Sequence, residues 1–481
     1  MTGEDVPKHV RSLTSARVLW VEGEIIGRLS QRASRPAHRV QVGARGLDRI
    51  DPTRAAVVGA LAGDGELIVV EGAAGSGKTA ALRATQTLLA RKGHRLMVVT
   101  PTLKAAEVAT DETGADGRSA AWLVHQHGWR WDDDGNWTRA AAAPDASAQL
   151  RPSDLLLVDE AGMLDQDTAQ ALLTIADESG ARVAFVGDRH QLPAVGRGGV
   201  LDHAFVWAHP TAVVSLEKVH RFTDPDYAAL SLRMRTGDDP SSVFDELHRR
   251  DQIVVHASDV ERTAALGTIG AAGDLVMADR REQVADLNAA IRDQRPPTRG
   301  EPALVTAKGE QLSIGDRVAT RRNDAELQVA NRQTWTIAGI RDDGGLVLRG
   351  RGREKEVPAD YAAQYVELAY ATTVHGAQGD TVDHAHFAMA ETTSAAAAYV
   401  AMTRGRQGNT AHLVAETVED ARQQWIDTFS RDRADLGPAH ARRQAIEAID
   451  RYGSAAVPTT QRRSSLPEHR PPTSQPTGIE L

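Results

Sequence analysis

Residues 67–79 read LIVVEGAAGSGKT, and this stretch decides the fold. Its leading apolar run, with no polar residue inside it, is typical of a strand buried on both faces of a parallel sheet. The pattern G-x-x-x-x-G-K-T follows at once, with Gly72, Gly77, Lys78 and Thr79 in its fixed positions, and a helical pattern comes after it. Strand, glycine-rich turn and helix in this order predict an α/β domain with a phosphate-binding loop.

Each part of this loop has an expected task. Backbone N–H groups and the helix N-terminus surround the β-phosphate of a nucleotide such as ATP. We expect Lys78 to contact the β- and γ-phosphate oxygens and Thr79 to bind Mg²⁺ through its hydroxyl. The predicted nucleotide-binding residues of the loop are Gly72, Ala73, Ala74, Gly75, Ser76, Gly77, Lys78 and Thr79.

Further buried strands follow, separated by helical patterns. Apolar runs occupy residues 96–99, 155–158 and 183–186, so the first half is predicted to be an α/β domain with a parallel sheet. The second of these runs ends directly before Asp159 and Glu160, at the sheet edge where open α/β sheets bind ligands. Asp159 is expected to hold Mg²⁺, usually through water, and Glu160 to activate the attacking water as general base.

Later segments supply the other polar groups that nucleotide hydrolysis needs. Gln191 in VAFVGDRHQLPAV follows a strand and is suited to sensing the γ-phosphate and its water. Arg221 in VHRF and Arg404 in YVAMTRGR would neutralise the γ-phosphate charge from the far side of a cleft between two sheet domains. The predicted catalytic residues are Lys78, Asp159, Glu160, Gln191, Arg221 and Arg404.

Other segments define the organisation of the chain. Residues 300–365 contain short strands and tight turns without a helical period, which predicts a small β-barrel inserted into a second α/β domain. Tryptophans flank an Asp-Gly turn within residues 129–137, which predicts a β-hairpin carrying exposed aromatic side chains. A leading helix is expected near the N-terminus, with an apolar face formed by Val18, Leu19, Ile25, Ile26 and Leu29.

Composition narrows the classes of function. The net charge is −9, so the chain is not a globally basic nucleic-acid binder, although a local basic groove is compatible with it. The absence of cysteine excludes disulfides, thiolate zinc sites and cysteine nucleophiles. No apolar run reaches the roughly 18 to 20 residues of a membrane span, and the N-terminus has no signal-peptide pattern. We therefore expect a cytoplasmic protein without membrane insertion.

Residues 374–386, VHGAQGDTVDHAH, leave two interpretations open at this point. His384 and His386 would project from the same face of a strand and could chelate a metal ion, as in a metal-dependent nuclease. The same stretch also suits a loop and strand that serve phosphate chemistry, with histidines hydrogen-bonded inside the fold.

Several segments together resemble the motif series of superfamily 1B DNA helicases related to the RecD subunit. The chain looks most similar to the helicase part of TraA/TrwC/TraI-type conjugative relaxases of actinobacteria, over about residues 12–415. In chain order, the segments are GAAGSGKT, TPTLKAA, LLLVDEAG, VGDRHQLPAVGRGG, VHRF, YATTVHGAQGDTVD and YVAMTRGR.

The resemblance implies two RecA-like domains with parallel sheets, ATP with Mg²⁺ in the cleft between them, and single-stranded DNA crossing both, with movement from 5′ to 3′. It also implies that Gln378 and Gly379 couple the nucleotide to the DNA. The residues that it implies at DNA phosphates are Thr100, Thr102, Lys104, Thr373 and His375.

The same resemblance gives an expected domain organisation. The expected parts are an N-terminal helical segment (1–45), a first RecA-like domain (46–205), a second RecA-like domain (206–415) with an SH3-like β-barrel insert (about 300–365), a C-terminal helix (416–450) and a disordered tail (451–481). A hairpin at about residues 122–140 is expected either to separate DNA strands or to pack in the core.

Some positions depart from the family pattern. Thr53 stands where relatives carry a glutamine that reads adenine, which leaves the preference for ATP open. Gly376 stands where relatives often carry Lys or Arg, and Arg332 stands where glycine is usual in the insert.

The N-terminal part lacks the expected features of a relaxase domain. No tyrosine precedes Tyr227, so the tyrosine nucleophiles of a relaxase are not expected in this chain. A separate relaxase or other conjugation proteins would then be partners of a stand-alone helicase module. The alternative is a non-catalytic DNA-binding remnant of a relaxase.

Overall fold

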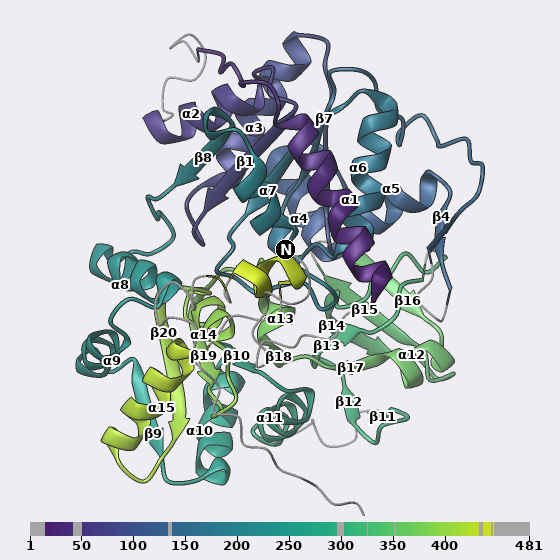
Figure 1. The fold of residues 1–481 in the computed structure, drawn as a ribbon. Coiled ribbons are helices and arrows are strands. Elements are labelled where there is room, and N and C mark those ends of the chain that lie inside the picture. Colours follow the sequence, from purple (N-terminus) through teal and green to yellow (C-terminus); the bar gives the residue numbers. More distant parts are fainter. Residues whose placement is uncertain are drawn as a thin grey trace, which may run out of the picture. The chain divides into compact units, whose positions relative to one another are not determined.

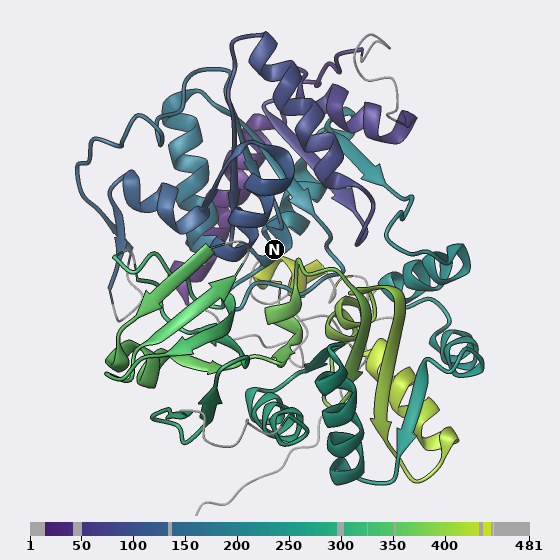
Figure 2. The same cartoon turned by 180° about the vertical axis from the view of Figure 1, so that it is seen from behind.

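The computed structural model describes residues 15–41, 51–132, 137–295, 303–324, 326–350, 353–431, 436–443 and 446. Its main features are two parallel sheets with helices packed against them, and an antiparallel sheet inserted between β10 and β18 of the second (Figures 1 and 2). The α/β class with parallel sheets is therefore confirmed. The expected disordered tail at 451–481 lies outside the described residues.

The first sheet has the strand order β3-β2-β6-β7-β1-β8, and all neighbouring strands run parallel. Its strands are β1 (Leu67–Gly72), β2 (Leu96–Thr100), β3 (Asp116–Ser119), β6 (Leu155–Val158), β7 (Arg182–Gly187) and β8 (Val213–Leu216). The central strands β1, β2, β6 and β7 are buried along their full length. Continuous apolar runs predicted these four strands because both of their faces are covered.

Alternate residues of each strand feed two separate cores. Leu67 and Val69 pack in one core with α1 (Ala16–Arg32), α5 (Ala120–Gln126), α6 (Gln166–Ser179) and α7 (Val200–Trp207). Ile68 and Val70 pack in the other with α2 (Pro52–Leu61), α3 (Lys78–Arg91) and α4 (Leu103–Thr113). This two-sided cover holds the carboxyl ends of the strands in fixed positions at one sheet edge.

The second sheet has the parallel order β18-β10-β19-β20-β9. Its strands are β9 (Ile253–His256), β10 (Leu275–Ala278), β18 (Ala371–Thr373), β19 (Val382–Ala388) and β20 (Gly405–Val414). The helices of this half are α8 (Pro225–Thr236), α9 (Pro240–Arg249), α10 (Asp259–Ala272), α11 (Arg281–Asp293), α13 (Val374–Ala377), α14 (Ala395–Ala401) and α15 (Val418–Ser430). We call the two halves the first and second sheet domains.

The insert forms an antiparallel sheet in the order β16-β15-β14-β13-β17. Its strands are β13 (Arg317–Thr320), β14 (Thr334–Ile340), β15 (Leu346–Gly350), β16 (Arg353–Val357) and β17 (Val366–Leu368), with α12 (Ala359–Tyr365) before the last. A hairpin of β11 (Ala303–Val305) and β12 (Gln311–Ser313) precedes it. The SH3-like topology of this insert stays a prediction.

A second hairpin carries the tryptophans. β4 (Trp129–Trp131) and β5 (Trp137–Arg139) pair antiparallel, and Trp131 lies opposite Trp137 with ring centroids 5.2 Å apart. Trp131 is exposed, whereas Trp129 and Trp137 are half-buried and pack against the first sheet domain. Exposed and packed tryptophans thus occur in one hairpin.

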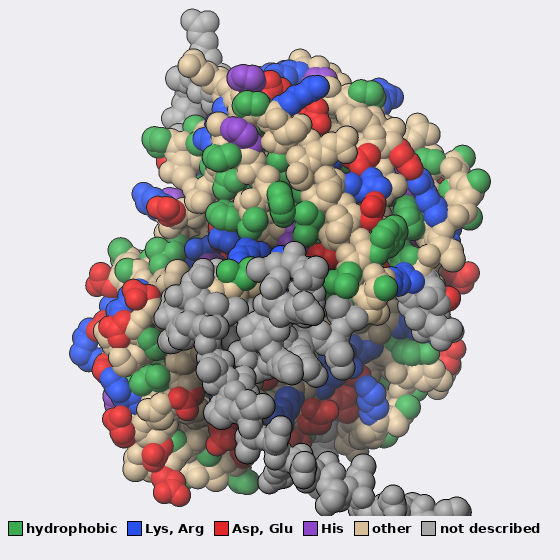
Figure 3. All heavy atoms as spheres, viewed as in Figure 1, with side chains coloured by type: hydrophobic (Ala, Val, Ile, Leu, Met, Phe, Trp, Pro, Cys, Tyr) green, Lys and Arg blue, Asp and Glu red, His purple; other side chains and the backbone are tan. Residues whose placement is uncertain are grey.

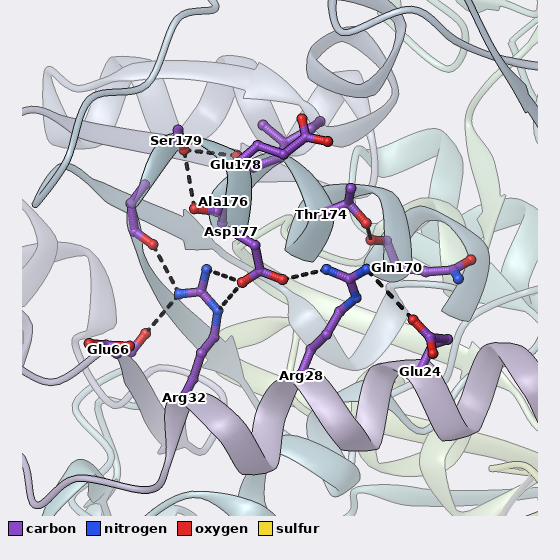
Figure 4. A network of polar contacts seen from close by, with 12 residues as sticks. Glu24, Arg28, Arg32, Glu66, Gln170, Thr174, Ala176, Asp177, Glu178 and Ser179 are labelled. Atoms are coloured by element: carbon purple, nitrogen blue, oxygen red, sulfur yellow. Dashed lines mark hydrogen bonds and ion pairs between the residues drawn. The ribbon is translucent and has the colours of Figure 1, made fainter.

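The leading helix α1 is fixed to α6 by arginines (Figure 4). Arg32 donates to Asp177 Oδ1 at 2.6 Å and to the Ala181 carbonyl at 2.9 Å, and Arg28 pairs with the same carboxylate. Val21, Ile25 and Leu29 form the buried face, whereas Leu19 is 52% exposed. The predicted face was therefore wrong at Leu19, because the helix turns Val21 toward the core in its place.

The chain returns to the first sheet domain after α15. Trp425 and Phe429 of α15 pack in the core of the second sheet domain. Ala439 N then donates to Glu22 Oε1 on α1 at 2.7 Å, and a Cβ on Gly199 would lie 2.1 Å from the Leu436 carbonyl oxygen. The chain therefore passes between the two sheet domains at two places, once after β8 and once after α15.

None of the helices in the described ranges is long and apolar enough to cross a membrane.

Candidate functional site

The phosphate-binding loop joins β1 to α3. Gly77 precedes α3 with a φ of 86°, a left-handed conformation that suits glycine. Lys78 Nζ donates a hydrogen bond to the Gly72 carbonyl at 2.7 Å. Gly75 has a φ of 76°, and a Cβ there would lie 2.3 Å from Arg221 Cβ. The loop and Arg221 are therefore in direct contact.

The other loop residues have distinct surroundings. Ser76 N donates to the Ala73 carbonyl at 3.1 Å, and the buried Ser76 hydroxyl has no hydrogen-bond partner among the residues that the structure describes. Ala74 N donates to the hydroxyl of Tyr399 at 3.1 Å. Thr79 lies in the first turn of α3, and Asp159 directly follows β6. A hydroxyl and a carboxylate are hard oxygen groups of the kind that Mg²⁺ prefers, so these two residues stay candidates for a metal site.

The acidic pair and two glutamines meet at the edge of the first sheet. Asp159 and Glu160 follow β6, and Glu160 N donates to Asp159 Oδ1 at 2.9 Å. Gln378 Nε2 lies 3.5 Å from Glu160 Oε2 and 3.3 Å from Gln191 Oε1. Gln378 belongs to the second sheet domain and follows directly after α13. The next residue, Gly379, has a φ of 87°. The structure thus brings together residues predicted from three separate motifs.

Both predicted arginines lie beside this cluster. Arg221 Nη1 donates to the Thr403 carbonyl at 2.6 Å, next to Arg404, which is 2% exposed. Burial and the neighbouring Arg404 lower the pKa of Arg221 to about 9. Burial also lowers the pKa of Arg404, while Glu160 acts in the opposite direction. Two desolvated cations next to each other favour a bound anion between or beside them.

A buried polar network links the two sheet domains at the same place. Tyr399 Oη, on α14, donates to Asp188 Oδ2 at 3.0 Å, in addition to accepting from Ala74 N. Arg235, on α8, binds Asp188 Oδ1 at 2.9 Å and Glu71 Oε1 at 2.6 Å. Burial, together with Asp188, raises the pKa of Tyr399, which therefore stays protonated as a donor. The network ties the ends of β1 and β7 to two helices of the second sheet domain.

Several residues expected at DNA line two cavities. The smaller cavity, of about 50 Å³, is lined by Thr102 and His375 together with Gln378 and Gly379. The larger, of about 400 Å³, extends between the second sheet domain and the insert and is lined by Thr373. Both cavities share Asn331, Arg332 and Gly376 as lining residues, so they adjoin. The two cavities together extend from residues of the first sheet domain to residues of the insert.

The structure argues against a direct DNA contact by Thr100. This residue is 1% exposed, and its hydroxyl donates to the Thr102 carbonyl at 2.7 Å. Its single hydroxyl proton is engaged in this bond, so Thr100 stabilises the turn between β2 and α4. Lys104 lies on α4, but its side chain is outside the described part of the chain.

The described side chains on one face of the molecule include charges of both signs (Figure 3). Lys and Arg are interspersed with Asp and Glu on the face drawn in Figure 3. This agrees with the net charge of −9.

The histidines after α13 do not form a metal site. His384 is exposed, whereas His386 Nδ1 lies 3.1 Å from His412 Nε2, and His412 Nδ1 lies 3.0 Å from His256 Nε2. Asp274 lies 3.4 Å from the other nitrogen of His386. Burial and the neighbouring histidines lower the pKa of His412 to about 3. Within the described ranges, no cluster of three or more His, Asp or Glu residues is arranged to hold a metal ion, so the nuclease interpretation has no support from these histidines.

Sequence reasoning missed some residues of this site. Tyr399 sits in an alanine-rich helix and gives the pattern of a core residue, and Arg235 lies outside every recognised motif. Arg54 follows Thr53, and a Cβ on Gly77 would lie 2.6 Å from the Arg54 guanidinium. Arg54 lies on α2, and the departure from the family pattern at the preceding residue, Thr53, is the sequence signal that could have drawn attention to it.

Comparisons with known proteins agree with this geometry. Residues 49–259 match the family described as AAA domain. The conjugal transfer protein TraA of Rhizobium radiobacter is 25% identical over 425 residues, covering 84% of this chain and 36% of TraA. The ATP-dependent DNA helicase Pif1 of Bdellovibrio bacteriovorus is 27% identical over 410 residues, covering 79% of this chain and 89% of that protein. The chain thus spans about a third of the TraA protein that it matches.

A solved structure shares the fold. It is the Pif1 helicase from Bacteroides in complex with ADP-AlF3 and single-stranded DNA, which superposes with a TM-score of 0.52 at 18% identity, covering 81% of this chain and 95% of that one. Together, the matched domain and these relatives show that the chain is similar to an ATP-dependent DNA helicase of the Pif1 type and to TraA conjugal transfer proteins.

Proposed function

We propose that this protein is an ATP-dependent motor that moves along single-stranded DNA and unwinds duplexes, with two RecA-like sheet domains. The observation that carries the proposal is the position of Gln378. Its amide, which comes from the second sheet domain, contacts both the proposed general base Glu160 and the proposed γ-phosphate sensor Gln191. A residue beside the DNA-facing cavity thereby touches the groups that would activate water.

In the proposed hydrolysis, each group of the cluster has one task. Lys78 exchanges its bond to the Gly72 carbonyl for the β- and γ-phosphate oxygens, and Thr79 and Asp159 hold the Mg²⁺ that comes with ATP. Glu160 orients and deprotonates the attacking water. Arg221 and Arg404 neutralise the charge that develops on the γ-phosphate, and their mutual repulsion is relieved when the phosphate arrives.

The DNA would lie in the two adjoining cavities. Thr102, His375 and Thr373 line this path and suit contacts to the sugar-phosphate backbone. Because Gln378 and Gly379 line the smaller cavity and Gln378 also reaches Glu160, DNA binding would reposition the catalytic groups. We therefore propose that hydrolysis depends on single-stranded DNA.

The direction and pathway are further parts of the proposal. By similarity to the motif series, movement runs from 5′ to 3′. The names of the TraA relatives favour conjugative transfer or the processing of a mobile element as the setting, with a relaxase as partner.

The decisive measurement is ATP hydrolysis by the purified chain with and without oligo(dT), with Lys78→Ala as the inactive control. We expect hydrolysis to rise at least about tenfold on DNA addition and to be lost in the control. Equal rates with and without DNA would contradict the motor and leave a non-catalytic DNA-binding protein as the better description. Unwinding of 5′-tailed but not 3′-tailed duplexes then tests the direction.

A further inference from the structure

Arg332 has an unfavourable backbone conformation. It lies in the turn before β14 with a φ of 67°, a left-handed conformation in which a side chain is strained and glycine is not. Its N–H donates to the Thr320 carbonyl at 2.6 Å, which fixes the turn against β13. Strained residues that persist in a well-bonded turn are frequent at binding sites, so the side chain of Arg332 calls for a role.

This side chain lies at the junction of the two cavities. Arg332 and Gly376 line both of them, so the guanidinium stands beside the segment that carries His375 and Gln378. Residue 376 is a glycine and brings no charge there. Among the residues that line both cavities, Arg332 from the insert is therefore the cation.

The electrostatic surroundings of Arg332 lack a counter-ion. Within the described part of the chain, its guanidinium has no hydrogen bond or ion pair, and burial together with Arg321 and Arg281 lowers its pKa. Of the carboxylates that line the larger cavity, Glu367 is paired with Lys308 and Arg321, and Glu310 accepts a hydrogen bond from Leu368 N. Burial of an unpaired guanidinium among other cations is unfavourable until an anion joins them.

We propose that Arg332 binds a phosphate of single-stranded DNA at the junction of the two cavities, so that the DNA path continues from the second sheet domain onto the insert. The inference rests on the proposed DNA-dependent function and extends it to a residue outside the motif series. Phosphate is the favoured anion because a guanidinium forms bidentate hydrogen bonds with it. The contact would be independent of base sequence, because it reaches only the backbone.

The positive φ of Arg332 allows its charge to be removed without loss of stability. Arg332→Gly removes the charge and relieves the strained φ, so this variant should unfold at the same temperature as the wild type or a higher one. Arg332→Lys keeps the charge in the same turn. Arg349→Gln removes a cation of β15 that is paired with Glu354 and lines neither cavity, and it serves as the matched control.

The measurement is the Kd for fluorescein-labelled (dT)₂₀ and (dA)₂₀ over a series of NaCl concentrations. We expect Arg332→Gly to raise both Kd values about tenfold at low salt and to reduce the slope of log Kd against log salt by about 0.7, which is one phosphate contact on a single strand. Arg332→Lys should retain the slope, and Arg349→Gln should match the wild type.

An unchanged slope in Arg332→Gly, with the DNA-stimulated ATP hydrolysis of the wild type intact, would overturn this inference and leave the proposed function standing. A wild type that neither binds oligonucleotide nor responds to it would overturn both. Loss of binding to (dA)₂₀ alone would also refute the contact, because a phosphate contact weakens both sequences equally.

Discussion

Substitution of Tyr399 by phenylalanine tests whether the buried network couples the two sheet domains. The change keeps the ring and removes the hydroxyl, which donates to Asp188 at 3.0 Å and accepts from Ala74 N at 3.1 Å. A hydrogen bond to a carboxylate contributes about 1.5 to 3 kcal/mol and a neutral one about 1 kcal/mol, so the loss is about 2 to 4 kcal/mol. Asp188 keeps its bond to Arg235, which favours the lower figure.

The expected result is a slower turnover with little change in ATP binding. If about 2 kcal/mol of the lost stabilisation acts only when the domains are aligned for hydrolysis, kcat in the presence of oligo(dT) falls about 30-fold. The KM for ATP should change less than about threefold, since the hydroxyl binds a loop amide and not the nucleotide. The assay is steady-state ATP hydrolysis at saturating DNA.

The control is Tyr361→Phe, which removes a buried hydroxyl that donates to the Arg322 carbonyl within the insert. It should lower the melting temperature without slowing turnover. Should Tyr399→Phe melt like this control and hydrolyse ATP within twofold of the wild type, the network would be structural only and the coupling argument would be refuted.

The other predictions concern catalysis, pH and stability. Glu160→Gln should lower the DNA-stimulated kcat at least about 100-fold while ATP still binds, which single-turnover hydrolysis and fluorescent nucleotide titration would measure. A residual rate above about a tenth of the wild-type rate would exclude Glu160 as the general base. The folded state holds His412 neutral, because its pKa there is near 3. The stability that this group contributes is therefore complete above pH 6.5 and falls by about 2 kcal/mol by pH 5. Urea unfolding of the wild type and of His412→Gln would reveal this loss, with the exposed His384→Gln as control. Arg32→Ala should cost about 3 kcal/mol in unfolding free energy, because it removes the buried partner of Asp177, and a loss below about 1 kcal/mol would contradict the role given to this pair.

Local sequence patterns predicted the parts of the fold that depend on one segment at a time. The apolar runs at β1, β2, β6 and β7 predicted a parallel sheet because a strand covered on both faces has no polar alternation. The fixed spacing from Gly72 to Thr79 predicted the phosphate-binding loop, because this loop also depends on the residues of one short segment. In both cases the residue types within the segment determine its conformation.

Features that depend on distant segments escaped prediction. Tyr399 bonds to Ala74 and Asp188, which lie 325 and 211 residues away in the chain, and an alanine-rich helix gives no hint of either partner. Thr100 was expected at DNA from its motif position, but whether a threonine at a strand end faces outward depends on the loop that covers it. Arg332 is visible in the sequence as a departure from the family pattern, while its place between two cavities required the packed insert.

The chain passes between the two sheet domains twice, which bears on how the proposed motor would move. With a single linker, the domains could separate, twist or slide. The segment after β8 joins the two sheet domains, and the hydrogen bond from Ala439 to Glu22 on α1 connects the part of the chain after α15 to the first domain again. In the proposed motor, a movement of one sheet domain relative to the other would therefore act on both connections at once.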